Sequence, residues 1–293
     1  MREVERIHRP QLKDVPAELI HRIQMLLPVK EAGRTCVLSK SWMHAWSTIP
    51  TLRFRPPRKD LSKRQLIRYT DLINRTLQRY RMDNIPITSF DLHFRILNQK
   101  SISFANLWIQ TVASRSCLKE LYLTLSALEE ESITLPDELF SGENLETISV
   151  KADDTLFIVR HSLLISNNIV IKCVNLRVLE LIDVMLSDET LVKLFSTCIL
   201  LEKINLSKCK GLSIIRVKNL HYLRELEITP RIGNSTSEIY DVPSLQVFKH
   251  NLLGYRNNLV SNSLESVREL VLKGEMMDDA VRILGPKTTQ VIQ

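Results

Sequence analysis

The first fifty residues show hydrophobic spacing that is typical of short helices. Between residues 17 and 27, five apolar side chains recur at intervals of three and four, which places them on one stripe of an amphipathic helix: Leu19, Ile20, Ile23, Leu26 and Leu27. Asp14 is a candidate N-cap, and Pro28 ends this helix and opens the next, over 29–38. Ser39 can cap a third helix that carries Trp42 and Trp46. Three such helices make a unit that is too small to bury a core of its own.

The next segment changes from extended to helical character. Pro56 and Pro57 predict an extended linker over 53–60. Residues 62–81 then predict an amphipathic helix, whose apolar side carries Leu66, Tyr69, Leu72, Ile73, Leu77 and Tyr80.

From residue 87 onward one apolar phrase recurs, in which a leucine-like residue is followed three and five positions later by two more. The copies begin at residues 87, 118, 145, 176, 201, 223, 245 and 267, and the last three intervals are all 22 residues. Each phrase predicts a short strand with alternate residues pointing inward. Because no single copy can bury its apolar side, the copies must stack and share one continuous core.

Helical stretches over 104–115 and 187–198 separate some of these strands. We therefore predict an α/β solenoid, a curved leucine-rich-repeat array of about eight strand-containing repeats with the strands on its concave side, preceded by the small helical unit.

The outward positions of the repeated strands should line that concave face. They carry Asp91, Glu120, Tyr122, Glu180, Asn205, Glu225, Glu227 and Glu269, with only Lys203 and Lys249 as bases. The pattern predicts a protein partner that presents Lys or Arg, and a face that repels nucleic acid. The alternative is that these charges only keep the strand surface soluble.

The chain has 293 residues and a net charge of +7, and this charge comes from one segment. Residues 53–81 hold ten Lys or Arg and two Asp, a net +8, which leaves −1 for the rest. A solvated outer helix and linker is the simpler interpretation. Binding of an acidic partner or nucleic acid is the other.

The residue types that carry catalysis are not arranged for it. The seven histidines lack metal-ligand spacing, and the seven glycines form no phosphate-binding loop. The five cysteines are odd in number and widely spaced, which predicts reduced, mostly buried thiols. We expect no enzyme, metal or cofactor. The sequence shows neither a secretory signal nor a membrane-spanning segment, so we expect a protein of the nucleus or cytoplasm.

Residues 14–54 resemble the F-box motif, in particular the plant-type F-box that is joined to leucine-rich repeats. The resemblance rests on Pro16 with Glu18-Leu19-Ile20, on the run from Leu26 to Lys30, and on Val37-Leu38-Ser39-Lys40, Trp42, Trp46, Pro50, Leu52 and Phe54. The phrases CLKELYLTL and NLRVLELIDV extend it into the repeats. Gly33 departs from the pattern, since family members usually hold a larger apolar residue there, and glycine costs about 1 kcal/mol of helix propensity.

The resemblance implies an F-box over 12–54, a basic linker and helix over 55–84, and a repeat domain over 85–293. It further implies that the F-box binds a Skp-type adaptor, and through it a cullin, while the repeats hold a protein substrate for ubiquitination. The adaptor-binding residues would be Val15, Pro16, Leu19, Ile20, Ile23, Leu27, Val29, Val37 and Trp42. We expect Trp42 near the adaptor and Trp46 in the helical hairpin or its junction with the repeats, unless both are internal. A repeat scaffold without a ligase role stays the alternative.

Overall fold

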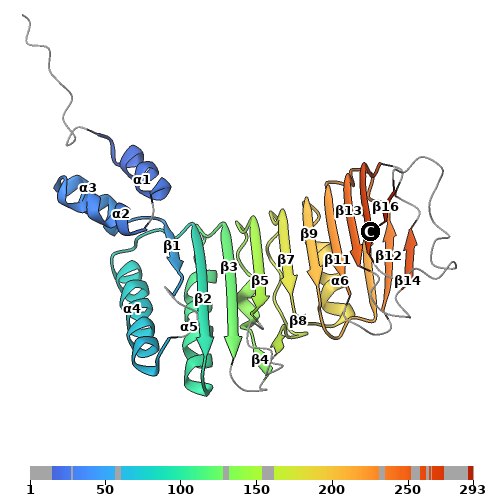
Figure 1. Ribbon diagram of the computed structural model, residues 1–293, viewed down its shortest axis with the longest axis horizontal. Helices are drawn as coiled ribbons and strands as arrows, with labels where there is room; N and C mark the ends of the chain where they lie inside the picture. The colour runs from blue at the N-terminus through green and yellow to red at the C-terminus, as the bar shows by residue number, and fades with distance from the viewer. Residues whose placement is uncertain are drawn as a thin grey trace, which may run out of the picture.

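The computed structural model describes residues 15–27, 29–56, 61–127, 132–153, 162–230, 235–251, 258–261, 264, 266–273 and 290–292. Within these ranges the chain forms a helical unit at one end of a long array of parallel strands (Figure 1).

The array is a ten-stranded parallel sheet in the order β1-β2-β3-β5-β7-β9-β11-β13-β15-β16. Eight of its strands are those predicted from the repeated phrase: β2 (Ser89–Ile96), β3 (Glu120–Ala127), β5 (Thr147–Ala152), β7 (Val178–Ile182), β9 (Lys203–Ser207), β11 (Glu225–Thr229), β13 (Val247–Asn251) and β15 (Glu269–Lys273). The predicted solenoid is therefore confirmed in its strands. Two strands, β1 (Thr51–Phe54) and β16 (Gln290–Ile292), were not predicted.

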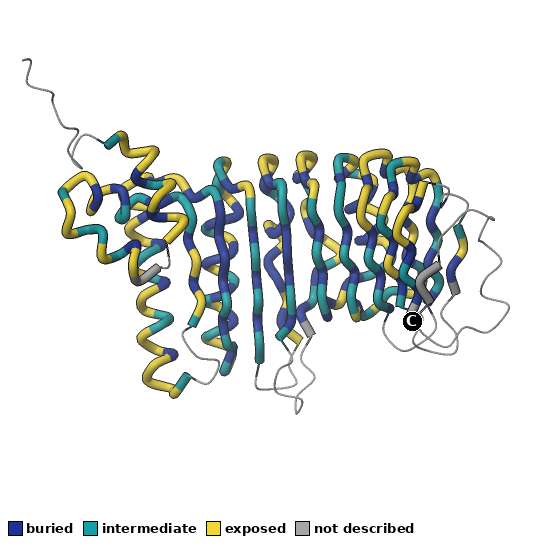
Figure 2. Tube along the Cα trace, turned by 45° about the horizontal axis from the view of Figure 1, so that its top comes forward, coloured by how far each residue is buried: buried dark blue, intermediate teal, exposed yellow. Residues whose placement is uncertain are grey.

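The register stacks the apolar residues of successive strands into continuous rows. One row runs from Leu52 through Phe90, Leu121, Ile148, Leu179, Ile204, Leu226 and Phe248 to Leu270, and all of these side chains are buried. Buried and less buried residues alternate along most strands of the long sheet in Figure 2, for example along β7 and β9. The residues between them point outward and form the open face of the sheet. The alternation of side chains along each strand therefore determines both the core and the exposed surface.

The other side of the sheet is covered by mixed structure. Helices α5 (Gln99–Ala113) and α6 (Asp188–Thr197) match the two predicted helical stretches. Elsewhere short parallel strands take that place, in two three-stranded sheets: β4 (Ser132–Thr134), β6 (Ser162–Leu164) and β8 (Val184–Met185), then β10 (Ile214–Lys218), β12 (Thr236–Tyr240) and β14 (Asn258–Ser261). In a repeat of 22 residues, few residues remain for the chain to run back along the second side of the sheet. A short strand with a turn fits this length more readily than a helix with its two connections.

The predicted boundary at residue 54 is wrong, because β1 pairs with β2 and belongs to the long sheet. Helix α4 (Lys63–Met82) follows, with Ser62 and Gln65 forming a capping box. It buries Leu66, Ile73, Leu77 and Tyr80 against the end of the array. Leu72, which was predicted on the apolar side, is instead 55% exposed.

The N-terminal unit consists of α1 (Ala17–Leu26), α2 (Val29–Arg34), a 3₁₀ turn (Thr35–Val37) and α3 (Lys40–Ser47). Ser39 caps α3 as predicted, since its hydroxyl accepts from the Trp42 N–H at 3.4 Å. Pro16 occupies the N-cap position of α1, and the predicted cap Asp14 lies outside the described residues. The unit sits beside β1 and above α4 in Figure 1.

All five cysteines are free thiols, and Cys173, Cys198 and Cys209 are buried, as predicted. Among the described residues, none of the helices is both long and apolar enough to cross a bilayer. The same residues contain no cluster of His, Cys, Asp or Glu that could hold a metal ion.

Candidate protein-interaction surfaces

The helical unit has a very small core. Ile20, Trp42 and Ala45 are buried against one another, and Val15 packs against them from one side. Three buried side chains bury far less apolar area than an independent domain needs. The unit is therefore a candidate for completing its burial against another protein.

Gln24 braces this core, and sequence reasoning missed it. Its side chain is 2% exposed, and its Nε2 donates to the Trp42 carbonyl at 3.0 Å and to the Thr35 hydroxyl at 2.8 Å. Thr35 in turn donates to the Ala32 carbonyl at 2.6 Å. One glutamine thus ties α1 to both other helical segments. A polar residue on the apolar stripe was the only signal in the sequence.

A row of apolar side chains on α1 faces solvent. Leu19, Ile23 and Leu26 are 48%, 40% and 85% exposed, and Leu27 follows at 36%. We call these four residues the apolar ridge. Val37, Leu38 and Met43 are also exposed on the neighbouring turn and on α3. Large apolar side chains exposed at helical spacing indicate an interface.

The structure corrects two of the predicted adaptor contacts. Ile20 and Trp42 are 0% and 4% exposed, because they face the inside of the helical unit, and neither presents a surface to a partner. Pro16 is exposed and Val15 is partly buried, while the side chain of Val29 lies outside the described residues.

Leu19, Ile23 and Leu26 of the ridge stay exposed beside the repeats, and the helical unit is hydrogen-bonded to the array through other residues. The Arg79 guanidinium donates to the Ser47 carbonyl at 2.7 Å, and the Tyr80 hydroxyl donates to the Ile49 carbonyl at 2.8 Å. Both donors belong to α4. The contact with the array therefore uses the end of α3 and the chain leading into β1.

Trp46 lies at this junction, as predicted for it. It lines a cavity of about 360 Å³ together with residues of α1, β1 and α4. Its ring also lies beside Gly33, where an added Cβ would be 3.7 Å from the nearest ring carbon.

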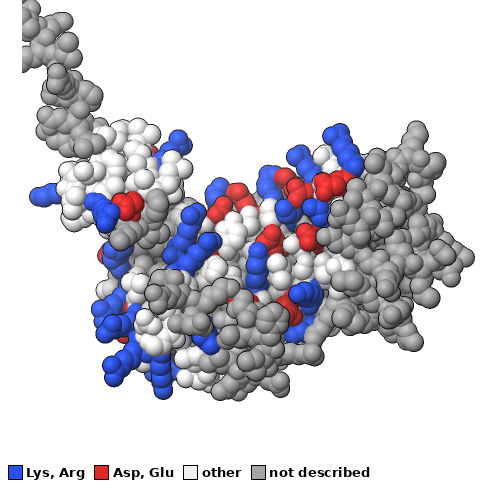
Figure 3. Space-filling model, viewed as in Figure 1, with Lys and Arg blue, Asp and Glu red and all other residues white. Residues whose placement is uncertain are grey.

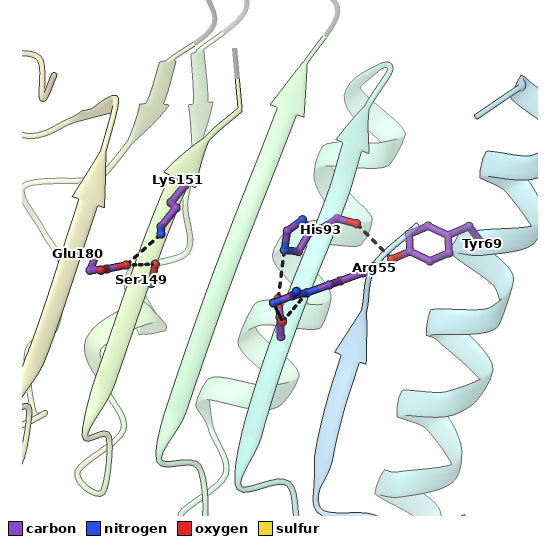
Figure 4. A network of polar contacts seen from close by, with 7 residues as sticks. Arg55, Tyr69, His93, Ser149, Lys151 and Glu180 are labelled. Atoms are coloured by element: carbon purple, nitrogen blue, oxygen red, sulfur yellow. Dashed lines mark hydrogen bonds and ion pairs between the residues drawn. The ribbon is translucent and has the colours of Figure 1, made fainter. Parts of the chain in front are cut away.

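On the open face, the first strands carry an ion-pair network (Figure 4). Arg55 lies 2.6 Å from an Asp91 carboxylate oxygen, and His93 lies 3.4 Å from the other. The Tyr69 hydroxyl of α4 donates to the His93 carbonyl. Burial alone would raise the pKa of Asp91, but hydrogen bonds from His93 and Arg55 outweigh it and hold that pKa below its usual value.

A second network lies two strands further along. Glu180 accepts from the Ser149 hydroxyl at 2.9 Å and pairs with Lys151 at 3.0 Å (Figure 4). Burial raises the pKa of Glu180, and these two partners more than compensate, so that the pKa lies below its usual value. Tyr122 lies between the two networks in the register, and burial raises its pKa.

The predicted acidity of the open face is therefore reduced. Asp91 is 4% exposed beneath Arg55, so it does not line the surface. Glu180, Glu225 and Glu269 pair with Lys151, Lys203 and Lys249. Within the described part of the chain, Glu120 and Glu227 make no ion pair. Basic and acidic side chains are intermingled across this face in Figure 3, which makes it mixed in charge. Tyr122 and Asn205 belong to the same outward row of the sheet.

The family of the chain follows from a family model together with the relatives that the chain resembles. The sequence model for the leucine-rich-repeat domain of the At1g61320/AtMIF1 type matches residues 81–282. The chain belongs to the plant F-box/leucine-rich-repeat proteins. The matched range covers β2 to β15 of the long sheet.

Individual F-box/leucine-rich-repeat proteins of Arabidopsis thaliana are similar over about three quarters of this chain. F-box/LRR-repeat protein At5g02910 is 28% identical over 217 residues, which are 74% of this chain and 43% of that protein. F-box/LRR-repeat protein 25 is 26% identical over 221 residues, covering 75% of this chain and 76% of that protein. The chain spans less than half the length of At5g02910 and of the putative F-box/LRR-repeat protein At3g18150. No solved structure matches the chain.

Proposed function

We propose that this chain is a non-catalytic substrate receptor of a Skp–cullin–F-box ubiquitin ligase, working in the nucleus or cytoplasm. In this proposal α1 to α3 form the F-box and bind a Skp-type adaptor, while the open face of the repeats binds a protein substrate. The observation that carries it is the apolar ridge, exposed on a helical unit whose own core consists of three buried side chains.

The ridge can supply the free energy that docking needs. Fully burying a leucine or isoleucine side chain contributes about 1.5–3 kcal/mol. The four ridge residues are already partly covered, so an adaptor would gain several kcal/mol from them before the cost of association. Val37 and Met43 would extend the contact with the adaptor. Ile20 and Trp42 would instead stabilise the helical unit from inside.

A pulldown with a Skp-type adaptor tests this role. We expect Leu19→Asp and Ile23→Asp to abolish capture, because each places a charge in the docked interface. Leu107→Asp on α5 is the matched control, since Leu107 is also about half exposed but lies on the repeats. Capture that survives both ridge substitutions would refute the proposal.

The substrate face needs its own test, because it is mixed in charge. Glu227 makes no ion pair in the described structure, whereas Glu225 pairs with Lys203 at 2.7 Å. If substrates present Lys or Arg there, Glu227→Lys should lower substrate capture more than Glu225→Lys. Glu143→Lys, at an exposed position away from the sheet, is the control. Equal capture by all three variants would place the substrate elsewhere.

A further inference from the structure

Strand β1 forms one edge of the long sheet, and no described strand pairs with its outer side. The Ser89 N–H donates to the Pro50 carbonyl at 3.4 Å, so the main-chain groups of Leu52 and Phe54 turn toward β2. Those of Thr51 and Arg53 therefore turn away. No described residue hydrogen-bonds the main chain of Thr51 or Arg53 on that side. An open edge of this kind is a template for pairing with another strand.

The cavity of about 360 Å³ lies along this edge. Its apolar walls come from Met25, Leu27, Trp46, Phe54, Leu72 and Tyr80, and Thr51 and Arg53 themselves line it. The volume lies near the lower end of the range for ligand sites and can take one large side chain. The exposure of Leu72, contrary to its predicted burial, is explained by its position on this wall.

The charges around the cavity have one sign. Arg53 and Arg79 are the only ionisable groups besides Tyr80 among its lining residues, and none of the lining residues is acidic. Arg53 is exposed and makes no ion pair in the described structure. Helix α4 adds six basic residues against one acidic residue, which gives it a net charge of +5.

We propose that this edge groove, formed by the outer side of β1, the cavity and α4, binds an extended segment of a partner protein that carries acidic residues next to one large apolar side chain. The segment adds a strand to β1 through Thr51 and Arg53, its apolar side chain fills the cavity, and its carboxylates meet Arg53 and α4. This site lies at the edge of the open face and shares Leu27 with the apolar ridge, whose other three residues lie outside the cavity lining.

Each part of the groove selects this occupant over a nucleic acid. A polynucleotide could use the arginines but has no main chain that pairs with a strand edge. The apolar cavity gives a peptide a specific anchor that phosphate contacts lack. The lengths also fit, since a four-residue strand pairs with a short extended segment.

Selection from a displayed library of random octapeptides against the full chain tests the inference. We expect enriched peptides to combine Asp or Glu with one large apolar residue. A synthetic peptide of the enriched sequence should bind at least tenfold more weakly to Arg53→Glu, which reverses the charge at the edge, and to Thr76→Trp, which fills the cavity. Methylation of alternate peptide amides should weaken binding similarly, because it removes the donors that pair with β1.

Matched controls separate the groove from general charge and from folding. Arg224→Glu and Ser196→Trp make matching changes at exposed positions of the repeats, away from β1, the cavity and α4, and should alter affinity less than twofold. Basic enriched peptides, peptides insensitive to Arg53→Glu and Thr76→Trp, or no enrichment would overturn the inference. So would full competition by single-stranded RNA, or loss of peptide binding when a Skp-type adaptor is bound. Loss of peptide binding to the adaptor-bound chain would identify the adaptor as the occupant of the groove. Failure of the chain to capture the adaptor would refute only the proposed F-box function and would not bear on the groove.

Discussion

The imidazole Nε2 of His250 lies 3.0 Å from the Ser237 hydroxyl oxygen, deep inside the solenoid. His250 is on β13 of the long sheet and Ser237 is on β12 of a small sheet, so the contact joins the two layers. In the register, His250 stands between Ile228 and Leu272, in a row that is otherwise apolar. Its Nδ1 is buried without a hydrogen-bond partner in the described structure.

This buried histidine should make stability fall in mild acid. Burial lowers the pKa of His250 from 6.5 to about 4. Below about pH 6.5 the unfolded chain therefore binds a proton at this histidine, whereas the folded chain does not. The stability that is present at neutral pH is lost as the pH falls toward 4. Between pH 7.5 and 5.5 we expect a loss of about 1 kcal/mol in the free energy of unfolding from this residue.

Urea unfolding at both pH values measures this loss. His250→Leu should remove it, since leucine suits the row and does not titrate. His44→Leu, at an exposed histidine of α3, is the control and should keep the wild-type pH dependence. An unchanged pH dependence in His250→Leu would show that other groups are responsible.

The pair of Arg55 and Asp91 should contribute more to stability than an ordinary surface ion pair. Asp91 is nearly inaccessible, so Arg55→Ala would leave a buried carboxylate with the His93 imidazole as its remaining partner. We expect a loss of about 2 kcal/mol in the free energy of unfolding. The double variant Arg55→Ala with Asp91→Asn should recover part of it, because the buried charge is gone. Arg53→Ala should cost less than about 0.5 kcal/mol.

Because the pKa of Asp91 is lowered by folding, the stability that it contributes is present above about pH 4 and is lost as pH falls through its folded pKa. The penalty of Arg55→Ala should therefore shrink below about pH 4. A penalty that is constant down to about pH 2 would argue against the ion pair as its source.

Two glycines should respond to alanine in opposite directions. Gly33 lies inside α2, and an added Cβ would make ordinary contact with Trp46, so Gly33→Ala should stabilise the helical unit by up to about 1 kcal/mol. Gly211 has a φ of +80°, and its Cβ would lie 2.7 Å from the Leu186 carbonyl oxygen. Gly211→Ala should therefore lower Tm. Thermal unfolding monitored by circular dichroism measures both, and equal shifts would contradict the structure.

Trp42 should affect adaptor binding only through folding. Trp42→Ala removes the largest side chain of a three-residue core and should cost about 3 kcal/mol or more, with a loss of helix signal. Trp42→Phe should restore both the helix signal and adaptor capture. Ile23→Asp should instead lose capture while keeping the helix signal, since Ile23 is exposed. If Trp42→Phe kept the helix signal but no longer captured the adaptor, Trp42 would have to contact the adaptor directly.

Much of this fold follows from the periodicity of apolar residues. The repeated phrase identified eight strands, and their common face followed because alternate residues of a strand point to opposite sides. The helices over 17–26, 63–82 and 188–197 were also visible, since a stripe at helical spacing must be buried somewhere. The helix over 99–113 was predicted only from residue 104 onward. The spacing of apolar residues along the chain thus determined which residues pack together in the core and which class of fold they build.

Only the tertiary structure decided which faces stay open. Ile20 and Ile23 belong to one stripe in the sequence, yet three-dimensional packing buries the first and exposes the second. Thr51–Phe54 looked like the end of the helical unit and became an edge strand, because pairing with β2 depends on residues almost forty positions away. Asp91 and Glu180 counted as free acids until packing brought Arg55 and Lys151 to them. Charge pairing, burial of single residues and sheet edges arise from long-range contacts, which periodicity along one chain does not encode.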